Sequence, residues 1–409
     1  MNSANALEHQ SFVRYLIAST SAGFAVQIMS VAVGWQVYAI THDPLDLGLV
    51  GLSQFLPPLI LVLVTGLAAD HFNRRMIMGL CLGVEAICAL ALLLFTRSQP
   101  ETVWPVFVIL AVLGAARGFF NPASDALAPN LVPKEAIAHA ISLNSMGWQA
   151  ASICGPVAGG LLYGISGEVA YGTALALVIF AIIMIIAIGP VAQMAAQQEA
   201  GLKTLLAGFA YIRRARVVLG AISLDLFAVL LGGAVALMPI FASDILHAGP
   251  VGLGMLRAAP GVGGLVMAAW LSRHPVKDNA GRILFLWVAT FGVFTMVFGL
   301  SVWIPLSIAA LFLMGAADMV SVYVRETLLQ LWTPDDVRGR VNAVNRVFIG
   351  ASNELGEFRA GLAAAWLGAV TAVVIGGAGT VAIAAIWPRL FPELASARRL
   401  DGREAELPK

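Results

Sequence analysis

Long apolar runs, separated by short polar segments, fill almost the whole of this 409-residue sequence. The hydrocarbon core of a bilayer is about 30 Å thick, so a helix needs roughly 20 mainly apolar residues to cross it. We expect spans of that kind near residues 13–40, 47–69, 75–96, 103–128, 137–164, 169–190, 217–242, 249–271, 281–301, 303–330, 340–367 and 369–388. The sequence therefore predicts an all-α membrane protein with twelve transmembrane helices.

The composition indicates a chain that faces lipid more than water. Charged residues make up 11% of the sequence, whereas soluble domains carry about 25%. The net charge of +1 gives no reason to expect nucleic acid as a partner. All three cysteines, Cys81, Cys88 and Cys154, lie in apolar runs, where we interpret them as packing residues. We expect neither a metal site nor a cofactor.

The basic residues indicate the orientation of the chain in the membrane. Of 24 lysines and arginines, 19 fall at one set of helix ends and loops. Because cytoplasmic loops carry an excess of lysine and arginine, this pattern predicts that both termini are cytoplasmic and that the helix count is even. We expect a multi-pass protein of the cell inner (plasma) membrane. Its polar first dozen residues lead into a retained first helix rather than a cleaved signal peptide.

The longest polar stretch, residues 192–216, divides the chain into two parts of similar length. We expect an N-terminal six-helix half over residues 1–191, a cytoplasmic linker over 192–216, a C-terminal six-helix half over 217–390 and a cytoplasmic tail over 391–409.

The two halves repeat each other without gaps when the sequence is shifted by 201 residues. The segment GAAR falls on GAAD, so Arg117 corresponds to Asp318. Further matches at polar and glycine positions are Asp125 with Glu326, Asn144 with Asn345, Gly155 with Gly356 and Gly160 with Gly361. Parallel six-helix repeats about an axis along the membrane normal are typical of secondary transporters, which bind substrate between the repeats near the midplane.

Two motifs add a family resemblance that covers nearly the whole chain. The segment GLAADHFNRR resembles the signature G-x-x-x-D-x-x-G-R-R/K of the major facilitator superfamily, with matches at Gly66, Asp70, Arg74 and Arg75. Asn73 replaces the second glycine, and asparagine tolerates the left-handed conformation that we expect there. The fifth span carries a motif similar to the glycine–proline motif of exporters in this superfamily, namely Gly155, Pro156, Gly159 and Gly160.

The segments VGWQVYAITHDPLDLGLVGLSQFLPP and TPDDVRGRVNAV resemble the branch that contains the enterobactin exporter and the macrolide efflux proteins. This resemblance implies two pseudo-symmetric six-helix halves with spans one, four, seven and ten around a central cavity. It also implies alternating access and export of a small organic molecule, such as a siderophore or drug, by a proton-coupled antiporter. We expect substrate, protons and the lipid bilayer as partners, and a monomer.

Polar residues within the spans are the candidates for a substrate or proton site. An ionised side chain at the bilayer centre costs at least about 2.5–3.5 kcal/mol, so it needs a partner or a function. Arg117 and Asp318 are predicted to face one cavity as a pseudo-symmetric pair of opposite charges, serving either in transport or as a structural ion pair. Further candidates for this cavity are Asp225, Gln27, Asn121, Glu354 and Glu357. Glu354 or Glu357 can carry protons, or one of them can instead stabilise the loop that contains the signature motif.

A second group of charges lies near the predicted cytoplasmic ends of the spans. Asp125 and Glu326 are within expected reach of Arg74, Arg75 and Arg340, and we expect salt bridges of a cytoplasmic gate there.

Two other functions remain open at this point. A lipid or lysophospholipid flippase would have the same fold and a lateral opening that one sequence does not reveal. A passive channel or membrane enzyme is the remote alternative, because the sequence contains no Ser/His/Asp set, no His/Cys metal spacing and no phosphate-binding loop. We therefore expect no enzymatic activity.

Overall fold

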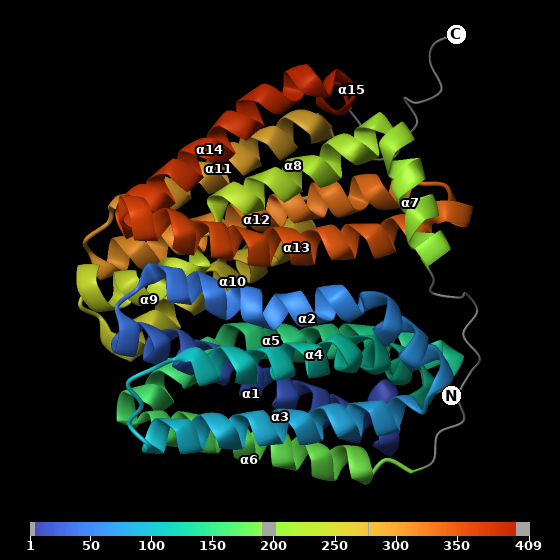
Figure 1. The fold of residues 1–409 in the computed structure, drawn as a ribbon. Helices are drawn as coiled ribbons and strands as arrows, with labels where there is room; N and C mark the ends of the chain where they lie inside the picture. The colour runs from blue at the N-terminus through green and yellow to red at the C-terminus, as the bar shows by residue number, and fades with distance from the viewer. Residues whose placement is uncertain (1–4, 190–201, 277, 398–409) are drawn as a thin grey trace. The chain divides into compact units, whose positions relative to one another are not determined.

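The computed structural model describes residues 5–189, 202–276 and 278–397, which form helices with no β-strand in these ranges (Figure 1). The chain folds into two compact units. The first unit combines residues up to His42 with Leu52–Gly201 and Ala248–Ala258. The second combines Asp43–Gly51, Leu202–His247 and the chain from Ala259 onwards.

The helices of the first unit are α1 (Gln10–Thr41), most of α2 (Pro44–His71), α3 (Arg74–Arg97), α4 (Trp104–Leu127), α5 (Ile137–Ile165), α6 (Gly167–Ile186) and the start of α10 (Gly249–Arg273). Short 3₁₀ turns, Ala6–Glu8, Ala128–Leu131 and Lys134–Ala136, precede α1 and α5.

The helices of the second unit are the start of α2 (residues 44–51), α7 (Leu202–Arg214), α8 (Arg216–Gly232), α9 (Met238–Ile240), the rest of α10, α11 (Ala280–Leu300), α12 (Ile304–Trp332), α13 (Asp335–Leu367), α14 (Ala369–Leu390) and α15 (Pro392–Ala395). The polar linker expected over 192–216 thus contains a helix, α7.

Glycines allow α1 and α5 to pack closely in the first unit. A Cβ atom on Gly155 would stand 2.5 Å from the Cβ of Gln27, and one on Gly159 would stand 3.0 Å from the Cα of Ile28. Small residues at such contacts let membrane helices approach one another until their backbones nearly touch, which maximises van der Waals packing.

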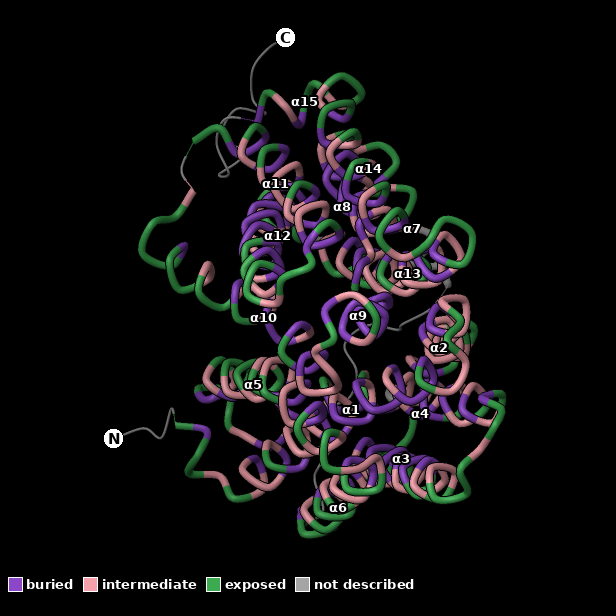
Figure 2. Tube along the Cα trace, turned by 90° about the vertical axis from the view of Figure 1, so that its left-hand side faces the viewer, coloured by how far each residue is buried: buried purple, intermediate pink, exposed green. Residues whose placement is uncertain are grey.

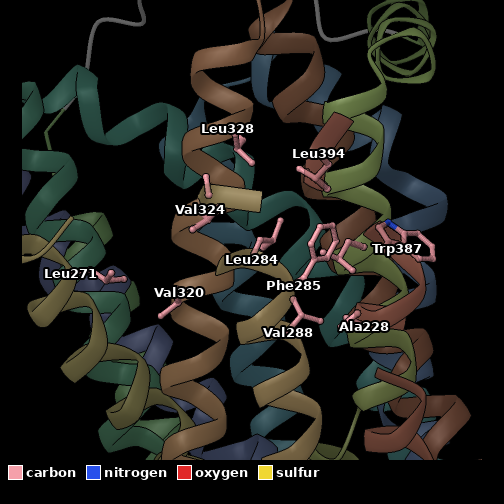
Figure 3. Close-up of a cluster of buried hydrophobic side chains, with 14 residues drawn as sticks. Ala228, Leu271, Leu284, Phe285, Val288, Val320, Val324, Leu328, Trp387 and Leu394 are labelled. Carbon is pink, nitrogen blue, oxygen red and sulfur yellow. The ribbon is translucent and has the colours of Figure 1, made fainter. Parts of the chain in front are cut away.

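The second unit is held together by a cluster of buried apolar side chains (Figure 3). Phe285 and Val288 of α11 pack with Val324 of α12, and Trp387 of α14 closes the cluster. The indole nitrogen of Trp387 donates a hydrogen bond of 3.0 Å to the carbonyl oxygen of Gly220 in α8. This bond satisfies the one polar atom of a side chain that is otherwise apolar.

Both units expose large apolar side chains, and Figure 2 shows exposed residues in green along the helices of each unit. On α3, for example, Leu80, Ile87 and Leu94 recur every seven residues on one face and are 64%, 67% and 55% exposed. Within the described residues, ten helical segments are long and apolar enough to cross a membrane. The long helices α5 and α13 are not among these ten, and with them the arrangement is consistent with twelve spans. The protein is a multi-pass membrane protein.

The seventh span is not the continuous helix expected over 217–242. α8 ends at Gly232, and a 3₁₀ turn (Val235–Leu237), α9 and a π-helical turn (Phe241–Ile245) follow. The break coincides with the glycine pair Gly232 and Gly233, since glycine favours helix ends over helix interiors. Arg359 of α13 donates hydrogen bonds to the freed carbonyl oxygens of Leu230 (2.8 Å) and Leu231 (2.5 Å).

Candidate functional site

The polar centre of the first unit is an ion pair between neighbouring helices. The Nε atom of Arg117 on α4 lies 2.5 Å from Oε1 of Glu85 on α3, and Glu85 is completely buried. Arg117 also donates a 3.2 Å hydrogen bond from Nη2 to the carbonyl oxygen of Ala22 on α1. Its guanidinium group lies 5.3 Å from the ring centre of Phe120. Arg117 therefore links α4 to both α1 and α3.

Helix geometry explains why Glu85 meets Arg117. α3 and α4 are consecutive helices joined by a short connection, so they run antiparallel. Glu85 precedes Arg97, the last residue of α3, by nearly as many residues as Arg117 follows Trp104, the first residue of α4. The two separations differ by one residue. Residues at matching distances from one connection share the same depth in the membrane.

Asp318, the repeat counterpart of Arg117, lies half-buried on α12 in the second unit. Within the described part of the chain, its carboxylate has no hydrogen bond and no ion pair. The pair that the structure shows for Arg117 is formed inside the first unit. The two predicted partners are thus unlike in their surroundings, since Arg117 is neutralised by Glu85 and Asp318 forms no ion pair among the described residues.

Asp225 has a partner in the second unit that the sequence analysis did not assign. Its Oδ1 forms an ion pair with Nη1 of Arg325, which joins α8 to α12. Asp225 is 8% exposed and Arg325 is 3% exposed, so the pair is shielded from solvent. Nε of Arg325 also lies 4.0 Å from Oε1 of Glu326, which accepts a 3.0 Å hydrogen bond from Nδ2 of Asn345 on α13.

Glu326 therefore has partners other than the expected Arg340. Arg340 is exposed near the start of α13, and the described residues offer it no ion pair. Glu326 instead contacts Asn345 and Arg325, because these side chains face it from the neighbouring helix and the preceding residue.

Two of the corresponding positions of the first unit, Ser124 and Asn144, carry neutral polar side chains that share a hydrogen-bonding partner. Ser124 matches Arg325 in the repeat. Its hydroxyl oxygen lies 2.8 Å from the hydroxyl oxygen of Tyr15 on α1. The same Tyr15 hydroxyl donates a 3.4 Å hydrogen bond to Oδ1 of Asn144 on α5. The repeat thus preserves polar contacts between helices at this level, through hydroxyl and amide groups around Ser124 and through charged groups around Arg325.

The two arginines of the signature loop contact helix ends. Arg74, only 6% exposed, donates from Nη1 to the carbonyl oxygen of Ala126, beside Asp125 at the end of α4 (3.2 Å). Arg75 donates to the carbonyl oxygens of Ile185 (3.0 Å) and Ile186 (2.8 Å) at the end of α6. Both arginines therefore bind backbone carbonyl oxygens in the last turns of helices, where basic side chains are favourable.

The glycine position of the signature adopts a conformation that differs from the expected one. Asn73 has φ −63° and ψ 112°, not a left-handed conformation, and its side chain accepts a hydrogen bond from the backbone nitrogen of Met76 (3.2 Å). Asparagine at this position caps the N-terminus of α3. Gly66 lies half-buried on α2, whereas the side chain of Asp70 lies outside the described residues.

The acidic residues of α13 converge on α2. Oε2 of Glu357 and Oε2 of Glu354 lie 3.0 and 3.2 Å from the point where a Cβ of Gly51 would stand. One turn of helix thus brings two carboxylates to the same small residue. Gly48, one turn earlier on α2, lies against the backbone of Phe358.

The remaining predicted site residues have mainly packing contacts. Gly155 and Gly159 pack against α1, as described above. Gln27 is half-buried at this contact. Pro156 and Gly160 lie against Gly254 at the start of α10. Asn121 is exposed on α4.

Comparison with known proteins agrees with this architecture. A family model described as a transmembrane secretion effector matches residues 2–402. The chain belongs to this family of the major facilitator superfamily. The chain is 27% identical over 404 residues to the enterobactin exporter EntS of Citrobacter koseri, covering 94% of this chain and 93% of that protein. It is 28% identical over 389 residues to the uncharacterized MFS-type transporter YfiS of Bacillus subtilis, covering 90% of each.

A crystal structure of a mutant of the nucleoside transporter NupG has the same fold, with a TM-score of 0.74 at 14% sequence identity. The structural alignment covers 93% of this chain and 100% of the NupG chain. Members of the major facilitator superfamily are transporters rather than enzymes, and this chain is a transporter of that superfamily.

For a major facilitator transporter, the intramembrane charges fall into two groups. Arg117 and Asp225 are each neutralised by a partner in their own unit, which makes them suited to hold helices together. Asp318 forms no ion pair within the described residues, and Glu354 and Glu357 lie together beside Gly51. A carboxyl group without an ion pair, such as that of Asp318, can gain and lose a proton without leaving a cation unpaired.

Proposed function

We propose that this transporter is a proton-coupled exporter, an antiporter that expels a small organic molecule such as a siderophore or drug by alternating access. The likeness to an enterobactin exporter over almost the full length supports export of this substrate class. The observation that carries proton coupling is the position of Asp318, midway along α12 with no ion pair in the described chain.

Asp318 suits a proton carrier because its two charge states differ strongly in cost. An ionised carboxylate inside the membrane without a cationic neighbour is unfavourable, whereas the protonated form is neutral. Proton uptake and release at this residue would therefore shift the balance between conformations that differ in access to water. By contrast, a protonated Asp225 would leave Arg325 as an uncompensated buried charge.

The energetics of one proton are sufficient for export. A proton that crosses a membrane potential of about 100 mV releases about 2.3 kcal/mol, which supports a concentration ratio of a few tens. Glu354 and Glu357 are a second candidate for the same task, since two carboxylates beside Gly51 repel each other unless one of them is protonated.

The signature loop is proposed to form the cytoplasmic gate. With both termini in the cytoplasm, Arg74 and Arg75 lie at the cytoplasmic ends of the helices, where they bind the ends of α4 and α6. Breaking and remaking such contacts as the helices move would couple the loop to alternating access.

Export is tested in a bacterial strain that lacks its own enterobactin exporter. We expect the wild-type chain to raise enterobactin in the medium or to lower susceptibility to a macrolide such as erythromycin. Asp318→Asn should lose that activity while reaching the membrane in normal amounts. Ser321→Ala, a change at a buried residue one turn away on α12, is the matched control and should remain active. Export of neither compound would contradict the substrate class, and an active Asp318→Asn variant would contradict the role of Asp318.

A further inference from the structure

The helix α7 has a different direction from the membrane spans α8 and α13. Figure 1 shows that α7 runs across the ends of α8 and α13, whereas the spans lie alongside one another. Its inner face is apolar: Ile212 is 1% exposed and packs with Val341 and Val344 of α13. Tyr211 donates a 3.4 Å hydrogen bond from its hydroxyl to the carbonyl oxygen of Trp332. α7 is therefore a docked surface helix rather than a flexible connection.

The outer face of α7 combines an aromatic ring with basic residues. Phe209 is 49% exposed, and Arg213, one turn further on, and Arg214 are both exposed. The first turns of α13 approach this helix, because the carbonyl oxygen of Arg340 lies 2.6 Å from the point where a Cβ of Gly208 would stand. We call the exposed side chains of Arg213, Arg214 and Arg340 the basic patch.

The basic patch has no acidic counterpart in the described parts of the chain. None of its three arginines forms an ion pair there, whereas their neighbour Arg216 lies 3.4 Å from Glu393. Phe209 rests on Phe348 of α13, with ring centres 6.5 Å apart, so its outer surface faces away from the protein. Phe209 and Arg213 lie one turn apart on α7, so positive charge and exposed aromatic surface occur together there, and no group among the described residues forms an ion pair with the patch.

We propose that the basic patch and Phe209 form a binding site for the headgroups of anionic phospholipids. Guanidinium groups bind phosphate oxygens through paired, charge-assisted hydrogen bonds. Aromatic side chains favour the boundary between headgroups and acyl chains, where the ring is shielded from water. The helices α8 and α13 on which α7 lies are membrane spans, so their ends bring the patch to the level of the headgroups.

This placement favours lipid over a soluble acidic protein as the occupant. A basic helix with an exposed aromatic ring that lies along the bilayer surface gains both electrostatic attraction and apolar burial. The site would hold α7 against the membrane and thereby fix the end of α8, which follows α7 after a single residue.

Lipid binding is tested by native mass spectrometry of the full-length protein with phosphatidylglycerol and with phosphatidylcholine. We expect preferential retention of phosphatidylglycerol, weakened about tenfold in the double variant Arg213→Gln/Arg214→Gln, because each basic residue near an anionic surface contributes severalfold to binding. The matched control is Arg97→Gln/Arg282→Gln, which removes two exposed arginines from other helices and should bind as the wild type does. Thermal unfolding in detergent verifies that both double variants are folded.

A second measurement locates the contact. A spin label at Phe209→Cys, with the three native cysteines replaced, should lose access to a water-soluble relaxation agent when vesicles of phosphatidylcholine are exchanged for vesicles containing phosphatidylglycerol. Free glycerol phosphate should not reproduce this change, which distinguishes a lipid from a soluble phosphate. Equal phosphatidylglycerol binding by the two double variants, or a label whose water access is independent of lipid charge, would overturn the proposal.

Discussion

Arg117 of α4 forms its ion pair with Glu85 of α3, at 2.5 Å between Nε and Oε1, inside the unit to which both residues belong. This pairing changes the interpretation of the repeat. Arg117 and Asp318 occupy matching positions, yet the positive charge of Arg117 is already balanced within its own unit. The two matching positions therefore differ: Arg117 forms an ion pair, whereas Asp318 forms none within the described residues.

The ion pair of Arg117 should be required for stability. Glu85→Ala leaves the arginine without its partner in a largely buried position, and breaking a buried pair costs about 3–5 kcal/mol. We expect a clear drop in the unfolding temperature in detergent, and a smaller drop for Glu85→Gln/Arg117→Gln, in which neither charge remains. If Glu85→Ala unfolds at the wild-type temperature, the pair does not stabilise the fold.

The ion pair of Asp225 with Arg325 should behave in the same way in the second unit. Arg325→Ala leaves Asp225 buried without its cation, and we expect a loss of about 3–5 kcal/mol in stability. Arg282→Ala, at an exposed arginine of α11, is the control and should change stability by less than about 0.5 kcal/mol. Fluorescence-detected unfolding of both variants makes the comparison, and equal stability would argue against a structural role for the pair.

Packing between α1 and α5 should depend on Gly155. In Gly155→Ala, the new Cβ would stand 2.5 Å from the Cβ of Gln27, so the helices must shift, at a cost of about 1–3 kcal/mol. Gly172→Ala on α6 is the control, because nothing lies within 4 Å of its new Cβ and alanine favours a helix over glycine. We expect lower stability and transport only for Gly155→Ala. Equal behaviour of the two variants would show that the contact yields without cost.

Single cysteines test the orientation in the membrane. In a chain without Cys81, Cys88 and Cys154, we expect cysteines near Gln99 and Glu168 to react with an impermeant thiol reagent from outside intact cells. Cysteines near Gln198 and Ala405 should react only after the cells are opened. The opposite pattern would reverse the topology.

The sequence predicted the helices well because a membrane span has a simple physical requirement, a long apolar run. It did not predict the break after Gly232, because glycine is common in membrane helices. A break at glycine also requires a donor that binds the carbonyl oxygens that the helix no longer uses. Here Arg359 does so from more than a hundred residues away in the chain.

Side-chain pairing was harder to predict than the spans. The repeat identified Arg117, Asp318 and Glu326 as special positions, but it compares each residue with its copy and not with its neighbour. Glu85 and Arg325 became partners of Arg117 and Asp225 through the packing of adjacent helices. For Glu85, equal depth on consecutive helices was a usable signal; for Asp225 and Arg325, the contact depends on which helices meet in three dimensions.

Proton coupling is tested most directly in everted membrane vesicles that contain the transporter. Respiration acidifies the vesicle lumen, so a proton-coupled exporter should accumulate enterobactin or a macrolide inside. We predict that a protonophore abolishes this accumulation, that removal of sodium does not affect it, and that vesicles with Asp318→Asn show none. Accumulation that persists with the protonophore and requires sodium or ATP would contradict proton-coupled export.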